Sequence, residues 1–296
     1  MPYRTPDDRF ENLPDFPFAP TYVTVGNEWR MHYVDEGDGA PILCLHGEPT
    51  WAYLYRHMIP PLANAHRVVV PDFIGFGRSD KLTEVKGYSF DLHYETLREF
   101  VEALDLSNIT LVVQDWGGLL GLAYAAQHPD RIARLVVLNT FLPTGEEEKS
   151  TAFLAWRRVV ENTADLPVGS IVRRGLAHPD RLSDAEEAAY DAPFPTTASK
   201  AGAVAWPLLV PMTPDDPGAS IMRKTRQRLS DWSKPAFVLF APDDPILGDA
   251  RNFFLDLLPT ARKQPSVTID DAGHFLQEEK GPIIAQHVLD FIDRTS

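Results

Sequence analysis

Short runs of consecutive apolar residues alternate along the chain with longer segments whose apolar positions have helical spacing. Continuous apolar runs are typical of parallel strands that are covered on both faces. Six such runs occupy residues 41–47, 66–72, 109–115, 134–140, 236–242 and 266–273. Two further β-rich stretches, "YVTV" and "RMHYVDEG", flank Gly26-Asn27 and predict an antiparallel hairpin.

Three segments between or after these runs predict helices. They cover residues 89–106, 117–130 and 281–295, and Ser89 is a plausible N-cap for the first of them. The second, "GGLLGLAYAAQHPD", is apolar on all sides, so we expect it to be buried. Strands that alternate with helices predict an α/β fold with a doubly wound, mostly parallel central sheet flanked by helices.

The alternation stops after Asn139. From about residue 141 to 230 the sequence contains helical patterns separated by prolines and no convincing strand. We therefore expect a helical cap over 141–230, inserted after strand 6 of a core that comprises residues 1–140 and 231–296. Open α/β sheets bind ligands beyond the carboxyl ends of their strands, where such a cap would enclose a pocket and exclude water.

Polar residues follow several predicted strands at this edge of the sheet. Asp115 comes after "LVVQ", Asp243 and Asp244 after "VLFAP", and His274 after "SVTIDDAG". Nucleophile, acid and histidine in this chain order predict the catalytic triad of an α/β-hydrolase fold. Asp244 is the preferred acid because Pro245 stiffens its loop, although the adjacent Asp243 stays an alternative.

The central position of the nucleophile turn "LVVQDWGG" holds Asp115, where many hydrolases carry serine. A carboxylate is already ionised at neutral pH, and it can displace a leaving group from a saturated carbon to leave an ester on the enzyme. Water activated by His274 would then hydrolyse that ester. An aspartate therefore predicts cleavage of a carbon–halogen bond or of an epoxide carbon–oxygen bond.

The segment "CLHGEPTW" places a second loop opposite the nucleophile turn. In this fold the oxyanion hole takes one backbone N–H from such a loop and one from the residue after the nucleophile. These donors would be the backbone N–H groups of Glu48 and Trp116. His46 has no partner at metal-ligand spacing, so we expect it to tie the loop down rather than to bind a metal.

The indole of Trp116 suggests a leaving group that needs hydrogen-bond donors. An indole N–H donates without accepting, which suits a departing halide, whereas an epoxide oxygen needs a proton donor such as tyrosine. The cap offers two further tryptophans, Trp156 and Trp206, but only one tyrosine, Tyr190. The larger number of tryptophans favours a substrate with a halide leaving group over an epoxide substrate.

Five segments together resemble the haloalkane dehalogenases, in the subfamily that binds halide with two tryptophans. They are "LHGEPTWAYLYR", "VVQDWGG", "TAFLAW", "APFPTT" and "DAGHFLQE". The resemblance implies Asp115 as nucleophile, His274 as base and Asp244 as its acid partner. It also implies Trp116 and Trp156 as halide donors and Phe153 as a pocket residue.

On this basis we expect hydrolysis of small haloalkanes to alcohol and halide through a covalent alkyl-aspartate, with no metal or other cofactor. An epoxide hydrolase using the same aspartate is the first alternative. A fluoroacetate-type dehalogenase would need an arginine where Trp116 stands. A non-catalytic binding protein of the same fold is disfavoured by the intact triad.

The overall charge narrows the range of partners. The formal net charge is −14, with a pI of about 5.0, so the sequence offers neither the basic face of a nucleic-acid binder nor a polybasic segment for a membrane surface. The single cysteine, Cys44, cannot form an internal disulfide, and no signal-peptide pattern is present. We expect a cytoplasmic, monomeric enzyme whose partners are the haloalkane, water and the halide ion.

Overall fold

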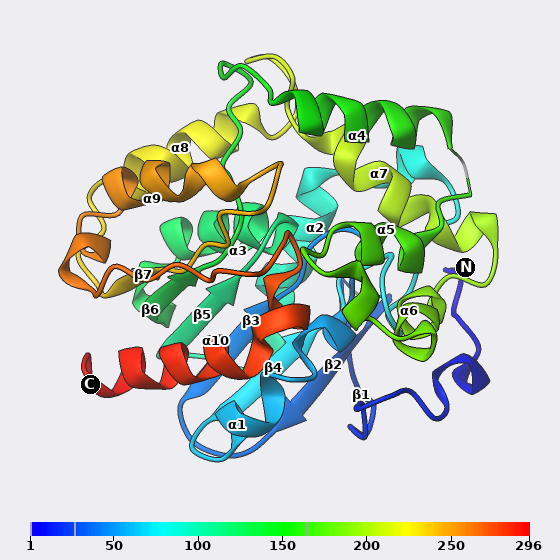
Figure 1. The fold of residues 1–296 in the computed structure, drawn as a ribbon, viewed down its shortest axis with the longest axis horizontal. Coiled ribbons are helices and arrows are strands. Elements are labelled where there is room, and N and C mark those ends of the chain that lie inside the picture. Colours follow the sequence, from blue (N-terminus) through cyan, green and yellow to red (C-terminus); the bar gives the residue numbers. More distant parts are fainter. Residues whose placement is uncertain (1, 27, 164) are drawn as a thin grey trace.

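The computed structural model describes residues 2–26, 28–163 and 165–296 (Figure 1). Seven strands form one sheet in the order β1-β2-β4-β3-β5-β6-β7. Their bounds are β1 Thr21–Val25, β2 Trp29–Glu36, β3 Pro41–Leu45, β4 Arg67–Pro71, β5 Ile109–Val113, β6 Ile132–Val137 and β7 Ala236–Val238. In this order the neighbours from β4 to β7 are parallel, while β2 pairs antiparallel with both β1 and β4, which confirms the mostly parallel sheet.

The centre of the sheet is buried on both faces, as its continuous apolar sequences predict. Every residue of β5 is buried, and in β3 all but Pro41 are. The predicted hairpin is the β1–β2 pair, although Asn27 at its turn lies outside the described residues.

Helices cover both faces of the sheet (Figure 1). The core helices are α1 Ile59–Ala63, α2 Phe90–Ala103, α3 Trp116–Gln127, α9 Arg251–Leu257 and α10 Leu276–Asp293. The Ser89 side chain accepts a hydrogen bond from the Leu92 N–H and caps α2 as expected. Helix α3 follows β5 directly and is buried through eleven of its twelve residues, from Trp116 to Ala126. A Cβ on Gly117 would lie 2.2 Å from the Leu45 carbonyl oxygen, so glycine is what lets α3 approach β3 so closely.

The chain between β6 and β7 is helical, and no strand occurs in its described part. It contains α4 Thr151–Asn162, α5 Val168–Arg174, α6 Asp184–Asp191, α7 Ala201–Leu209 and α8 Ala219–Leu229. In Figure 1, α4, α5 and α7 lie beyond the carboxyl ends of the strands, where a cap is expected. Helix α8 packs instead against α3 of the core. The limits 141 and 230 assigned to the cap stay a prediction.

The predicted strand at residues 266–273 is wrong. The structure has only a single parallel bridge there, between Phe240 and Thr268, with the Ile269 N–H donating to the Phe240 carbonyl. Pro265 has no N–H to pair, and Asp271 has a φ of 59°, which breaks extended pairing. The stretch available for pairing is therefore too short for a strand.

Among the described residues, no helix combines the length and apolarity needed to cross a membrane.

Candidate active site

Asp115 occupies a sharp turn between β5 and α3. Its φ of 47° and ψ of −124° are uncommon for a residue with a side chain. Two hydrogen bonds hold the turn: the Asp115 N–H donates to the Asn139 carbonyl at 2.8 Å, and the Thr140 hydroxyl donates to the Asp115 carbonyl at 2.6 Å. A Cβ on Gly47 would lie 2.3 Å from the Asp115 side chain, so only glycine allows the neighbouring loop to pass.

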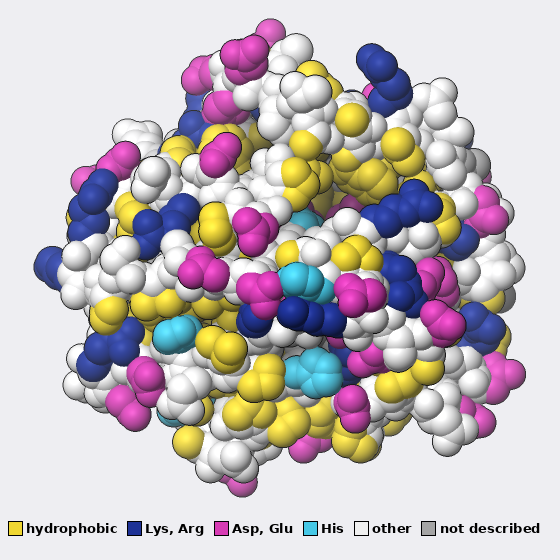
Figure 2. Space-filling view, viewed as in Figure 1, with side chains coloured by type: hydrophobic (Ala, Val, Ile, Leu, Met, Phe, Trp, Pro, Cys, Tyr) yellow, Lys and Arg dark blue, Asp and Glu magenta, His cyan; other side chains and the backbone are white. Residues whose placement is uncertain are grey.

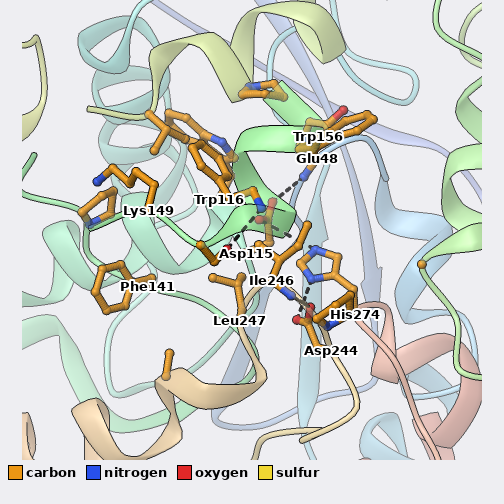
Figure 3. A pocket seen from close by; sticks show the side chains of 18 of the residues that line it. Glu48, Asp115, Trp116, Phe141, Lys149, Trp156, Asp244, Ile246, Leu247 and His274 are labelled. Atoms are coloured by element: carbon orange, nitrogen blue, oxygen red, sulfur yellow. Dashed lines mark hydrogen bonds and ion pairs between the residues drawn. The ribbon is translucent and has the colours of Figure 1, made fainter. Parts of the chain in front are cut away.

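Two backbone N–H groups face the Asp115 carboxylate (Figure 3). The Glu48 N–H donates to Asp115 Oδ1 at 2.7 Å. Burial raises the pKa of Asp115, and the opposing influences are the charge of His274 and the N–H groups of Glu48 and Trp116. The two donors expected of an oxyanion hole therefore converge on the carboxylate itself.

His274 lies between two carboxylates. Its Nδ1 is 2.8 Å from Asp244 Oδ2, and its Nε2 is 3.8 Å from Asp115 Oδ2. These charges outweigh the effect of burial and raise the pKa of His274 to about 9. Of the two adjacent aspartates, Asp244 is buried against His274, whereas Asp243 is exposed.

Asp244 is held by groups that favour its charged form. Its Oδ2 accepts a hydrogen bond from Asn139 Nδ2 at 2.9 Å, and its Oδ1 accepts from the Ile246 N–H at 2.9 Å. Although burial acts in the opposite direction, His274 and these donors lower the pKa of Asp244. Asn139 is a further site residue that the sequence analysis does not include, and the one signal for it is its place after β6, at the same sheet edge as the other site residues.

A cavity of about 590 Å³ lies above Asp115 and is lined mainly by apolar side chains. Asp115, Trp116, Phe153, Trp156, Asp244 and His274 all line it. Figure 2 shows hydrophobic side chains around a hollow on this face, and Figure 3 shows the labelled side chains grouped around Asp115. The structure thus brings together the predicted triad, both proposed halide donors and Phe153.

The other two aromatic candidates of the cap are engaged elsewhere. The Trp206 indole N–H donates to His93 Nε2 at 2.6 Å, and the ring stacks on Trp116 with a centroid distance of 5.1 Å. The Tyr190 hydroxyl donates to Glu278 at 2.5 Å, and Tyr190 does not line the cavity. Trp206 therefore packs against the Trp116 ring without lining the cavity, and Tyr190 is not placed to protonate a bound epoxide.

His46 connects the loop that follows β3 with the loop that follows β4. Its Nε2 accepts a hydrogen bond from the Phe73 N–H at 3.1 Å, and its Nδ1 is 3.0 Å from the Gly47 carbonyl oxygen. Burial lowers the pKa of His46 to about 4, so the ring is neutral at pH 7. This arrangement agrees with the structural role expected from the sequence.

The loop that carries His274 is tied to the cap. The His274 N–H donates to the Gly175 carbonyl at 2.8 Å. The Glu279 carboxylate accepts hydrogen bonds from three backbone N–H groups: Gly273 at 2.7 Å, Ala177 at 3.0 Å and His178 at 2.9 Å. One carboxylate therefore binds both the histidine loop and the cap segment that follows α5.

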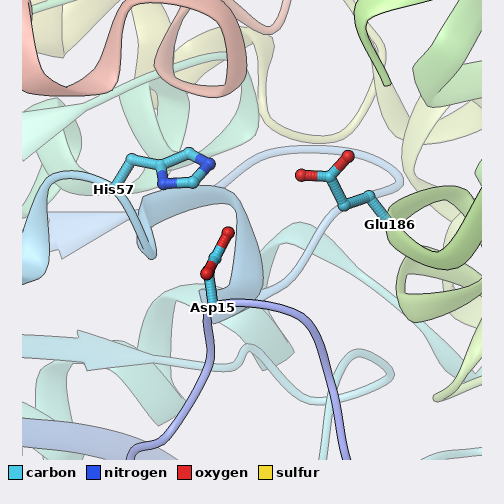
Figure 4. A group of neighbouring side chains, drawn as sticks. All are labelled: Asp15, His57 and Glu186. Atoms are coloured by element: carbon cyan, nitrogen blue, oxygen red, sulfur yellow. The ribbon is translucent and has the colours of Figure 1, made fainter. Parts of the chain in front are cut away.

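A second cluster of possible metal ligands lies outside the cavity. Ligand atoms of Asp15, His57 and Glu186 lie within 4.8 Å of one another (Figure 4). Both Glu186 oxygens already accept hydrogen bonds, one from Arg56 at 3.0 Å and the other from the Ser183 N–H at 2.8 Å. The nearby Arg56 guanidinium also disfavours a cation, so we infer no metal site there.

Comparison with known proteins places this geometry in a family. Residues 40–281 match the family model of the alpha/beta hydrolase fold. A haloalkane dehalogenase from Mycolicibacterium paratuberculosis is 48% identical, over 97% of this chain and 96% of its own. Haloalkane dehalogenase 1 of Mycobacterium tuberculosis is 49% identical, over 99% of each chain. The solved structure of a tetrameric haloalkane dehalogenase from Paraglaciecola agarilytica NO2 is 40% identical, with a TM-score of 0.91 over 98% of both chains. With its sheet, cap and carboxylate at the nucleophile turn, the chain belongs to the haloalkane dehalogenases of the α/β-hydrolase fold.

Proposed function

We propose that this enzyme hydrolyses the carbon–halogen bond of small haloalkanes to give an alcohol, a halide ion and a proton, through an ester on Asp115. The observation that carries the proposal is the Asp115 carboxylate in the lining of an apolar cavity, faced by two backbone N–H groups and by His274. The mechanism needs no group beyond these side chains, the backbone and water.

In the first step Asp115 attacks the carbon that carries the halogen. Its Oδ1 is held by the Glu48 N–H, so Oδ2 is the oxygen available to the substrate. The new carbon–oxygen bond forms as the carbon–halogen bond breaks, and the halide leaves with the bonding electron pair. The indole N–H groups of Trp116 and Trp156 would bind this halide in an apolar cavity, where hydrogen bonds to an ion are stronger than in water.

In the second step water attacks the carbonyl carbon of the ester. His274 Nε2 takes a proton from that water, while Asp244 holds Nδ1 and stabilises the imidazolium. The Glu48 and Trp116 N–H groups would stabilise the tetrahedral oxyanion. The imidazolium gives its proton to the alkyl oxygen as the bond from that oxygen to the carbonyl carbon breaks, which releases the alcohol. Asp115 keeps one oxygen from the water and returns to the carboxylate by losing the remaining proton to solvent.

A halide-release assay tests this function. We expect bromide release from 1,2-dibromoethane at a rate far above that of an Asp115→Asn variant, and no diol from styrene oxide. Diol formation without halide release would instead support an epoxide hydrolase. Inactivity in both assays would support a non-catalytic binding protein.

We propose separately that the chain is monomeric and cytoplasmic. Few large apolar side chains are exposed among the described residues, which supports a monomer because a stable interface between subunits would need such side chains on the surface. They are Val85, Leu154, Val159 and Ile283. Cys44 is buried and free of any disulfide. Light scattering tests the first point, because a tetramer like that of the Paraglaciecola relative would overturn it, and cell fractionation tests the second.

A further inference from the structure

Gln114 lies beside the general base but has no role in the two steps above. It follows β5, directly before Asp115, and its side chain is buried. Its amide nitrogen Nε2 is 3.2 Å from His274 Nε2 and also 3.2 Å from the His274 carbonyl oxygen. The same amino group therefore contacts both the ring and the backbone of the residue that must accept a proton.

The chemistry of these contacts defines the hydrogen bonds. A side-chain amide has two N–H donors on nitrogen and only acceptor sites on oxygen. An amide oxygen in place of the Gln114 nitrogen would lie against the His274 carbonyl oxygen, and two acceptors would then repel each other. In this orientation the buried Gln114 Oε1 has no hydrogen-bond partner among the described residues, so the contacts of the side-chain amide are those of its nitrogen with His274. One N–H thus donates to the carbonyl, and the other can donate only to a ring nitrogen that carries a lone pair.

We propose that Gln114 is a positioning residue that holds the His274 imidazole in its basic tautomer, with Nδ1–H toward Asp244 and the lone pair on Nε2. The inference rests on the proposed function, in which His274 Nε2 accepts a proton from water. The contact to the ring is long for a hydrogen bond, so a water molecule can displace it while the bond to the carbonyl keeps the loop in place.

The charged groups around His274 act in the opposite direction. In the free enzyme Asp244 and Asp115 both favour the imidazolium, and together they raise the pKa of His274 to about 9, whereas in the alkyl-enzyme only Asp244 keeps its charge. Glu48 lies beyond Asp115 and is itself buried, with a raised pKa that favours its neutral form, and Glu279 binds the backbone of the same loop. Gln114 is a neutral donor at Nε2, so it favours the neutral ring.

The test separates the two chemical steps in a Gln114→Met variant, which keeps the size of the side chain and removes the donor. Single-turnover reaction with 1,2-dibromoethane gives the alkylation rate from the halide burst. The hydrolysis rate follows from the decay of the alkyl-enzyme in mass spectra. We expect alkylation within twofold of the wild type and hydrolysis about three- to tenfold slower at pH 7.5. The acid limb of the hydrolysis rate should move to higher pH by about half a unit to one unit.

Two further variants make the result decisive. Gln114→Glu places an acceptor at Nε2, so its acid limb should move further to alkaline pH than that of Gln114→Met. Gln127→Met removes a glutamine that is exposed at the end of α3, and it should leave both rates unchanged. Unchanged hydrolysis and an unmoved acid limb in Gln114→Met would overturn the inference, whereas a wild type that releases no halide would overturn the proposed function instead. A normal alkylation rate shows that the variant is folded.

Discussion

Replacing Asp115 by Asn removes the carboxylate charge that faces His274 while nearly preserving the size of the side chain. The same charge disappears in catalysis when Asp115 becomes an ester, so the variant mimics the electrostatics of the alkyl-enzyme. Asp115 and Asp244 both raise the pKa of His274, which reaches about 9. With one of these charges gone, the imidazole should lose its proton more easily.

The separation of the two groups gives the size of the effect. His274 Nε2 and Asp115 Oδ2 are 3.8 Å apart, and both side chains are largely buried. At this distance two unit charges interact with about 4 kcal/mol at an effective dielectric constant of about 20, and with about 1 kcal/mol in water. Because one pKa unit corresponds to about 1.4 kcal/mol, the pKa of His274 should fall by about one to three units.

An NMR titration of the His274 ring measures this change in the wild type and in Asp115→Asn. Asp243→Asn is the matched control, because Asp243 is exposed and removing its charge should leave the pKa of His274 unchanged. If the pKa of His274 in Asp115→Asn equals or exceeds that of the wild type, the argument is refuted. The expected result means that alkylation itself converts His274 from an acid into a base for the second step.

Other predictions concern the trapped intermediate, the halide site and the packing behind it. His274→Gln should accumulate an alkyl-enzyme, seen as added mass after exposure to 1,2-dibromoethane, because the ester forms without a base to hydrolyse it. Trp156→Phe should weaken bromide binding by about ten- to a hundredfold, measured by fluorescence quenching, whereas Trp29→Phe on β2 should not change it. His93→Phe leaves the buried Trp206 N–H without its acceptor, so the free energy of unfolding measured in urea should fall by about 1–3 kcal/mol. Adding Trp206→Phe should restore part of that loss; a double variant no more stable than the single one would contradict this reasoning.

The residues at the ends of the parallel strands could be predicted from the sequence. Asp115, Asp244 and His274 each follow an apolar run, and the carboxyl ends of parallel strands lie at one edge of the sheet. The order of the three along the chain was enough to propose a triad, and the structure brings them together within hydrogen-bond or ion-pair distance.

Contacts that depend on tertiary packing could not be predicted. The bond from Gln114 to His274 joins residues 160 positions apart, and the bond from Trp206 to His93 spans 113 positions. The sequence does not indicate helix α7 as a separate element, because Pro207 stands inside "AGAVAWPLL" and a proline ordinarily interrupts a helix. The composition of residues 266–273 favours a strand, but Pro265 and the positive φ of Asp271 limit pairing to one bridge.

Hydrogen bonds of Glu279 and Gly175 connect the loop that carries His274 to the cap segment just after α5. That part of the cap is therefore fixed, whereas other parts can change. Any change in the chain path just after α5 would move His274, so insertions there should be lost during selection for turnover. Helix α4 carries Phe153 and Trp156 and packs on α7. Directed evolution toward longer or bulkier haloalkanes should therefore collect its substitutions on α4, where the shape of the cavity can change without disturbing proton transfer.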